Sequence, residues 1–101
     1  MRDLYSLTAS FPFLELYGLT GQIRRAAISV PSNVAEGAAR TTKREFAHYL
    51  SMARGSLSEI DTQLTIAKQL GYIDNDEEVQ QKLDRVFGLL GGLLKSIRTK
   101  D

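Results

Sequence analysis

The sequence predicts an all-α protein, an up-and-down antiparallel four-helix bundle with a short first helix. Two long stretches repeat apolar residues at alternating spacings of four and three, the pattern of one buried helix face. Helix-capping residues mark these stretches, and short loops make neighbouring helices antiparallel. With 101 residues, the chain is expected to form one domain covering residues 1–101.

The first helix is expected at residues 2–9, before a turn at residues 10–12. The next is expected to span residues 17–39, with Pro31 inside it. Proline removes one backbone hydrogen bond and crowds the preceding turn. The segment is therefore one kinked helix or two helices broken at residues 29–30. The apolar stripe keeps its phase across the proline, which favours the kinked helix.

The most regular apolar pattern covers residues 42–70 and predicts the longest helix. A capping box marks its start, with Thr42 at the N-cap and Glu45 three residues later. Gly71 can adopt the left-handed conformation that ends a helix. Gly55 lies in the helix interior, at a cost of about 1 kcal/mol relative to alanine. We therefore expect another backbone to approach closely at Gly55.

The last helix is expected to begin at residues 74–75, where Asn75 and Glu78 repeat the capping pattern. Acidic residues in its first turn and basic residues in its last turns suit the helix dipole. Its predicted buried stripe is Val79, Leu83, Val86, Leu90, Leu93 and Ile97, which Phe87 and Leu94 widen. Three glycines in its second half, which permit a tight helix contact or a bend, are Gly88, Gly91 and Gly92.

The composition points away from enzymes, metal sites and cofactors. Cysteine is absent, which excludes disulfides, thiolate metal sites and cysteine nucleophiles and fits a cytoplasmic protein. His48 is the only histidine and has no carboxylate at helical spacing, and no phosphate-binding loop occurs. The longest apolar run, residues 86–94, is about half the roughly 20 residues of a membrane span. We expect no membrane segment and no small-molecule substrate.

Charge is unevenly distributed, although the net charge is only +1. Residues 20–54 hold six basic and two acidic side chains, whereas residues 74–84 hold five acidic and one basic. This asymmetry suits the binding of a polyanion. It also suits head-to-tail contact between identical subunits, or simple complementarity to helix dipoles.

A polar stripe lies opposite the buried face of the kinked helix and consists of Arg25, Ser29, Asn33, Glu36 and Arg40, with Arg24 beside it. Three interpretations stay open: a solvated face with weak ion pairs, a satisfied polar network at a helix or subunit interface, or a phosphate-binding surface. The candidate network residues are Ser29, Asn33, Glu36, Ser56 and Glu59. The candidate nucleic-acid-binding residues are Arg24, Arg25, Arg40, Lys43, Arg44 and Arg54.

Three segments resemble a known family. They are YGLTGQIRRAAISVPSNVAEG at residues 17–37, ARGSLSE at 53–59 and LGYI at 70–73. They are similar to the signature motifs of the 23S rRNA intervening-sequence proteins, also called four-helix-bundle proteins. The resemblance implies a ring-like homo-oligomer, a pentamer. Some relatives serve diversity-generating retroelements, where a basic barrel is thought to bind nucleic acid and a reverse transcriptase.

Relatives usually have a longer first helix than residues 2–9. Either the start of the chain is misassigned, or the first helix is short and leaves part of the bundle groove open. Residues 13–17 are also more apolar than the charged turn of relatives, so we expect them across a bundle end or at a subunit contact. The expected function is a non-enzymatic homo-oligomer that binds RNA, DNA or a ribonucleoprotein through its arginines. The alternative is a protein-interaction scaffold without affinity for nucleic acid.

Overall fold

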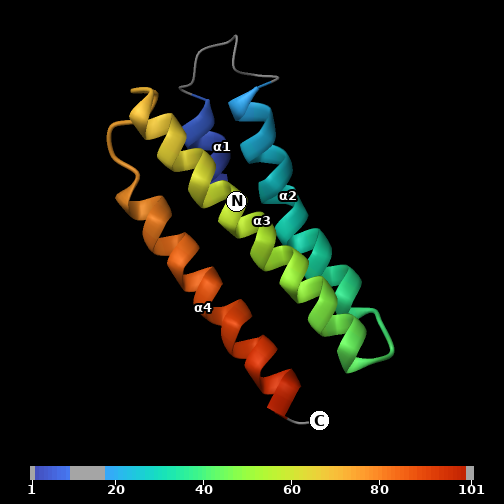
Figure 1. Cartoon of the computed structure of the whole chain (residues 1–101). Coiled ribbons are helices and arrows are strands. Elements are labelled where there is room, and N and C mark those ends of the chain that lie inside the picture. Colours follow the sequence, from blue (N-terminus) through green and yellow to red (C-terminus); the bar gives the residue numbers. More distant parts are fainter. Residues whose placement is uncertain (1, 10–17, 100–101) are drawn as a thin grey trace.

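Four helices of alternating direction make up the described part of the protein (Figure 1). The computed structural model describes residues 2–9 and 18–99, and no strand occurs within these ranges. The helices are α1 (Arg2–Thr8), α2 (Leu19–Ala38), α3 (Lys43–Gln69) and α4 (Glu77–Thr99). The predicted all-α bundle with a short first helix is therefore confirmed. Across the described ranges, no helix combines the length with the apolar character that a membrane span requires.

The second helix continues through its proline. α2 contains Pro31 and has no break, so the prediction of one helix is confirmed and the alternative of two is wrong. Ile23, Ala27 and Val30 are buried on one side of it, as the apolar stripe predicts. The predicted start of this helix at Tyr17 lies outside the described residues.

The third helix has the predicted signals at both ends. Thr42 Oγ1 accepts the backbone N–H of Glu45 at 3.1 Å and donates to the Glu45 carboxylate at 3.0 Å. At the other end, Gly71 has a φ of 79° and the N–H of Tyr72 donates to the carbonyl of Ala67 at 2.9 Å. This pairing is that of a Schellman motif, which satisfies carbonyls left free by the last turn.

The fourth helix begins at Glu77, after the predicted cap at Asn75. Asn75 Oδ1 does accept the Glu77 N–H, at 2.9 Å. The intervening Asp76 is buried, and its carboxylate accepts from Lys68 Nζ at 3.5 Å and Gln80 Nε2 at 3.3 Å. This carboxylate thus joins the end of α3 to the start of α4, where the helix dipole favours an anion.

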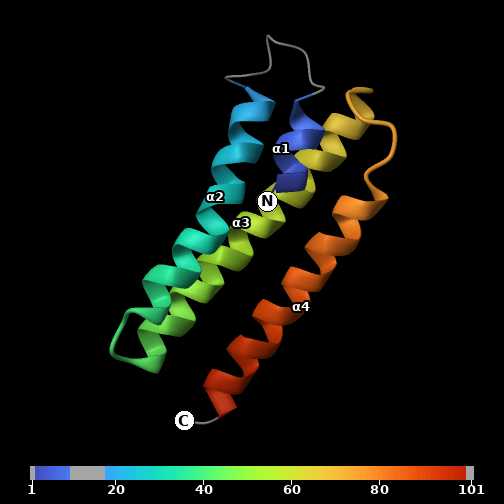
Figure 2. The ribbon, with the colours of Figure 1, turned by 180° about the vertical axis from the view of Figure 1, so that it is seen from behind.

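All four helices contribute to one apolar core. α2 and α3 pack against each other closely, α4 packs mainly on α3, and α1 packs on α2 (Figure 2). The buried apolar residues are Leu4, Ile23, Ala26, Ala27, Val30, Leu50, Ala53, Leu57, Ile60, Leu64, Ala67, Ile73, Leu83, Leu90, Leu94 and Ile97. The α2–α3 pair is therefore the frame to which the other two helices attach.

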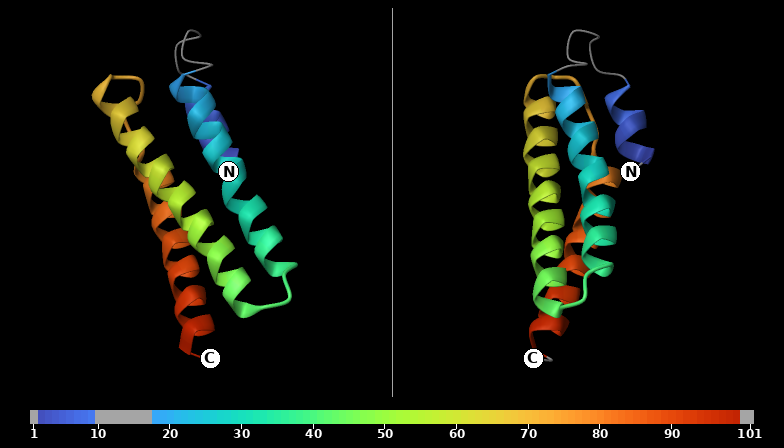
Figure 3. Two further views of the ribbon diagram at one scale, coloured as in Figure 1. Left: turned by 45° about the vertical axis from the view of Figure 1, so that its right-hand side comes forward. Right: turned by 90° about the vertical axis from the view of Figure 1, so that its right-hand side faces the viewer.

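The first helix covers only part of its neighbours (Figure 3). α1 has 7 residues and α2 has 20, which correspond to about 10 Å and 30 Å of helix. On α4, Leu89 is 68% exposed and Leu93 is 39% exposed. The prediction that Leu93 belongs to the buried stripe is wrong, whereas Leu94, which was predicted to widen that stripe, is buried.

A close approach of two helices occurs at Gly37 and not at Gly55. A Cβ atom on Gly37 would lie 2.8 Å from both Phe46 Cδ1 and Tyr49 Cβ. Around Gly55, no described heavy atom lies within 4 Å of the position of a Cβ, so the expectation of close approach there is wrong within this chain. The same open space surrounds the three glycines of α4, where the sequence suggests a tight contact or a bend.

Replacing Gly37 by alanine is expected to destabilise the bundle by about 1–3 kcal/mol, because the new methyl group overpacks the α2–α3 contact. The matched control is Gly88→Ala in α4, where the Cβ has room. That change is expected to stabilise by up to about 1 kcal/mol through helix propensity. Urea unfolding followed by circular dichroism measures both. If Gly37→Ala is as stable as the parent chain, α2 and α3 can move apart to admit the methyl group without a loss of stability.

Candidate functional site

A chain of hydrogen bonds links α2 to α3 near the middle of the pair. Asn33 Nδ2 donates to Ser29 Oγ at 2.9 Å, and the hydroxyls of Ser29 and Ser56 lie 2.8 Å apart. Ser56 Oγ also lies 3.3 Å from the carbonyl of Met52, to which it donates. Ser29 is then the donor to Ser56, so each hydroxyl both accepts and donates. Because Ser56 is buried, this pairing removes the cost of an unsatisfied polar group.

An open cleft lies beside this network, which we call the α2–α3 cleft. It has a volume of about 300 Å³, and Ala26 lines it together with six polar side chains. These six are Gln22, Arg25, Ser29, Ser56, Glu59 and Gln63. The cleft therefore unites Arg25 and Ser29, from the first sequence motif, with Ser56 and Glu59, from the second.

Two glutamines of the cleft were not among the predicted site residues. Gln63 Nε2 donates to Gln22 Oε1 at 3.4 Å across the cleft, and Gln63 Oε1 is buried with no partner among the described residues. Helical spacing could have identified both, because Gln22 lies three residues before Arg25 and Gln63 four residues after Glu59. Residues at these spacings share one helix face.

The two charged side chains of the cleft are not paired with each other. Arg25 and Glu59 are both exposed, and neither forms an ion pair or a side-chain hydrogen bond within the described part of the chain. A guanidinium keeps its charge at any physiological pH and presents five donors in a planar fork. The cleft therefore offers both a cation and an anion to a partner.

Arg24, by contrast, holds the first helix in place. Its Nε donates to Thr8 Oγ1 at 3.0 Å, and its Nη2 donates to the carbonyl of Tyr5 at 3.4 Å. The guanidinium also lies 4.9 Å from the centre of the Tyr5 ring, within range of a cation–π contact. Thr8 is buried and donates in turn to the carbonyl of Leu4 at 2.8 Å. Arg24 thus has a packing role that its sequence position did not reveal.

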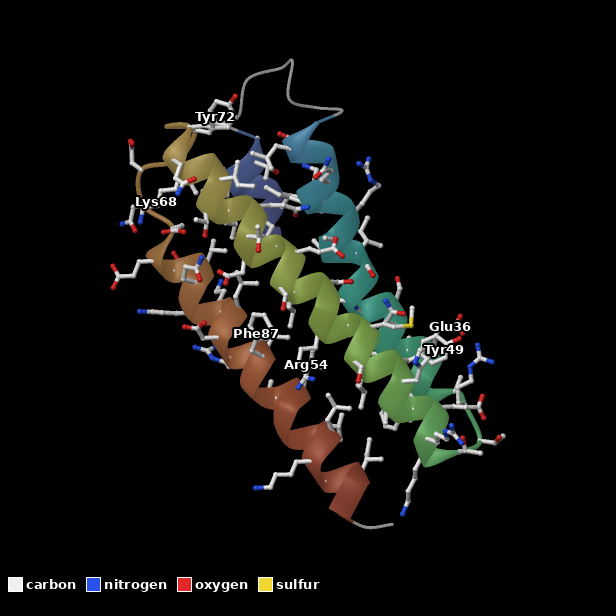
Figure 4. All side chains as sticks on the ribbon, in the orientation of Figure 1. Glu36, Tyr49, Arg54, Lys68, Tyr72 and Phe87 are labelled. Atoms are coloured by element: carbon white, nitrogen blue, oxygen red, sulfur yellow. The ribbon has the colours of Figure 1, made fainter. Side chains whose placement is uncertain are left out.

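Arg40 and Glu36 form a separate cluster near the α2–α3 connection. Arg40 Nη2 donates to Glu36 Oε2 at 3.0 Å and to the hydroxyl of Tyr49 at 2.8 Å. Its guanidinium lies 5.0 Å from the centre of the Tyr49 ring. Figure 4 shows Glu36 and Tyr49 together at this end of the helix pair. The predicted polar stripe is therefore divided between the cleft and an exposed ion pair, which adds little stability.

The six candidate nucleic-acid-binding residues do not form one patch. Arg24 and Arg25 lie in the first half of α2, and Arg40, Lys43 and Arg44 flank the α2–α3 connection. Arg54 points from α3 toward the side where α4 lies (Figure 4). In the described ranges, no group of three or more histidine, aspartate or glutamate side chains is arranged to hold a metal ion.

The basic and acidic segments lie at opposite ends of the bundle (Figure 1). The α2–α3 connection carries Arg40, Lys43 and Arg44, whereas the acidic side chains lie around the α3–α4 connection. These acidic residues are Asp74, Asp76, Glu77 and Glu78. The 27 residues of α3 span the distance between the two ends, about 40 Å at 1.5 Å per residue.

Arg24→Ala is expected to detach α1, because it removes a charge-assisted donor and the contact with Tyr5. Hydrogen bonds to charged groups contribute about 1.5–3 kcal/mol, so α1 amides should exchange at least about tenfold faster relative to α3 amides. The neighbouring Arg25→Ala is the control and should leave this ratio unchanged. Hydrogen–deuterium exchange read by NMR measures it. Undiminished protection of α1 in Arg24→Ala would mean that Leu4 alone anchors the helix.

The comparisons with known proteins agree with the fold and with the sequence motifs. The model of the family described as 23S rRNA-intervening sequence protein matches residues 1–92. A search of curated proteins found no match to the chain. The family match covers α1, α2, α3 and most of α4, and it includes every residue of the α2–α3 cleft. The chain therefore belongs to the 23S rRNA-intervening sequence protein family.

Proposed function

We propose that the protein is a non-enzymatic, cytoplasmic subunit of a ring-like homo-oligomer, a pentamer by resemblance, which binds RNA, DNA or a ribonucleoprotein. The observation that carries this proposal is the separation of charge, with cations around the α2–α3 connection and acidic residues at the other end. A surface of one sign attracts a polyanion, whereas mixed charges cancel. The family description, which refers to an insertion in ribosomal RNA, is in keeping with such a partner.

Three of the candidate arginines form no ion pair inside the described part of the chain. Arg25, Arg44 and Arg54 are exposed and have no ion pair within the described residues. Phosphate contacts by arginine displace counterions and bind without reading the base sequence. A single chain carries a net charge of only +1, so the repetition of Arg44 and Arg54 around an oligomer is part of the proposal.

The alternative function is a protein-interaction scaffold with no affinity for nucleic acid. Exposed apolar side chains support it, because Ile28 is 53% exposed, Met52 44% and Ile66 42%. Apolar side chains, methionine among them, are enriched at the core of protein interfaces. Both functions require an oligomer. They differ in whether the arginines bind phosphate groups. No catalytic step is assigned to the cleft that holds Glu59.

The double variant Arg44→Ala/Arg54→Ala is expected to bind single-stranded RNA more weakly and with a smaller salt dependence. Removing one arginine–phosphate interaction should reduce the slope of log affinity against log salt by about 0.7, and removing two should reduce it by about 1.4. Fluorescence anisotropy of a labelled RNA of roughly 20 nucleotides, over a range of salt concentrations, measures affinity and slope.

The matched control is Lys82→Ala/Arg85→Ala, which removes two positive charges from the first half of α4. It should keep the parent slope, since those residues lie toward the acidic end. Equal slopes for both double variants would contradict binding through Arg44 and Arg54. If the unmodified oligomer fails to bind RNA and DNA even at low salt, the scaffold function takes precedence.

A further inference from the structure

The α2–α3 cleft contains opposite charges that each lack a partner within the described residues. Arg25 projects from α2 and Glu59 from α3, and both line the same cleft of about 300 Å³. At the end of α2, by contrast, Glu36 does pair with Arg40 in the connection that follows, at 3.0 Å. A surface that exposes one cation and one anion on adjacent helices is complementary in charge to a second copy of itself.

The rim of the cleft has the character of a protein contact. Met52 and Ile66 lie seven residues before and after Glu59, on the same side of α3, and are 44% and 42% exposed. On α2, Ile28 follows Arg25 by three residues and is 53% exposed. Interfaces typically combine exposed apolar residues, methionine and arginine in this way.

Gly55 provides an independent observation on the same face. A glycine inside a helix costs about 1 kcal/mol relative to alanine, yet a Cβ at Gly55 would have no described atom within 4 Å. Packing inside the chain therefore does not account for it. Gly55 lies one turn before Glu59, where a neighbouring molecule seated on the cleft could approach the α3 backbone.

From these observations we infer that a second copy of the chain covers the cleft, and that Arg25 of one copy pairs with Glu59 of the next. When the same face of two copies meets, α2 of each copy lies beside α3 of the other, so the contact contains two such pairs. The cleft is incomplete in a single chain because each charge has its partner on another copy. This inference rests on the proposed homo-oligomer and names one of the surfaces that form it.

Charge reversal tests the pairing directly. Arg25→Glu and Glu59→Arg should each place like charges at the interface and weaken assembly at least about tenfold. The double variant Arg25→Glu/Glu59→Arg restores opposite charges across the interface and should recover the parent assembly. Light-scattering mass after size exclusion, over a concentration series, measures this. Arg54→Glu, a reversal on the α4 side of α3, is the matched control and should leave the mass unchanged.

The outcomes separate the inference from the proposed function. If the unmodified chain stays at 11.2 kDa at every concentration, the homo-oligomer and the pairing both fail. If the unmodified chain assembles and the single reversals assemble equally well, only the pairing is overturned. If the double variant is as dissociated as the single reversals, the pairing is likewise overturned. Circular dichroism checks that each variant is helical, and Arg25→Gln and Glu59→Gln repeat the test with less disturbance.

A second test uses the open space at Gly55. Gly55→Leu has room within the chain and replaces a poor helix former, so the helix itself should become more stable. The same leucine would occupy the space that a neighbouring α2 requires, and the assembly should weaken by at least about tenfold. Gly88→Leu on α4 is the control and should stabilise without changing the mass. Full assembly of Gly55→Leu would overturn the placement of the second copy over α3.

Discussion

The rest of the bundle depends on the close packing of α2 against α3. The two helices approach so closely at Gly37 that a single methyl group would meet Phe46 and Tyr49. Such an approach also brings polar groups into the interface, and the hydroxyls of Ser29 and Ser56 satisfy each other there. α1 then attaches to this pair mainly through α2, and α4 mainly through α3. Among the described residues, α1 and α4 each pack on this pair less extensively than α2 and α3 pack on each other.

Local rules were sufficient to predict the elements, because each signal lies within a few residues of the feature it sets. Thr42 with Glu45 begins α3, and Gly71 ends it, as the sequence indicates. The apolar stripe of α3 is buried from Leu50 to Ala67. The start of α4 was predicted at residues 74–75, whereas the helix begins at Glu77. Asp76 lies just before it, and its buried carboxylate interacts with Lys68 across the turn, a contact that the local sequence pattern does not reveal.

The candidate site was only partly predictable, because residues adjacent in sequence point to different neighbours. Arg24 and Arg25 differ by about 100° around the helix axis, so one contacts α1 and the other enters the α2–α3 cleft. The side of α2 on which α1 packs depends on contacts between residues far apart in the sequence. The spacing of residues along α2 does not predict it. Likewise, sequence alone did not distinguish Gly37, where helices touch, from Gly55, where they do not. The polar stripe was recognised, but its division between the cleft and the Arg40–Glu36 pair required the packing.

The order of the helices has a consequence for how the chain folds. Each helix packs mainly on its neighbour in sequence, and only a few residues separate α2 from α3. Contacts between sequence neighbours need little loop closure, and helical proteins of this kind typically fold within about microseconds to milliseconds. The α2–α3 hairpin holds the closest contact and is the natural nucleus, onto which α4 and then the short α1 can dock. A nascent chain would thus complete its central hairpin before α4 has been synthesised.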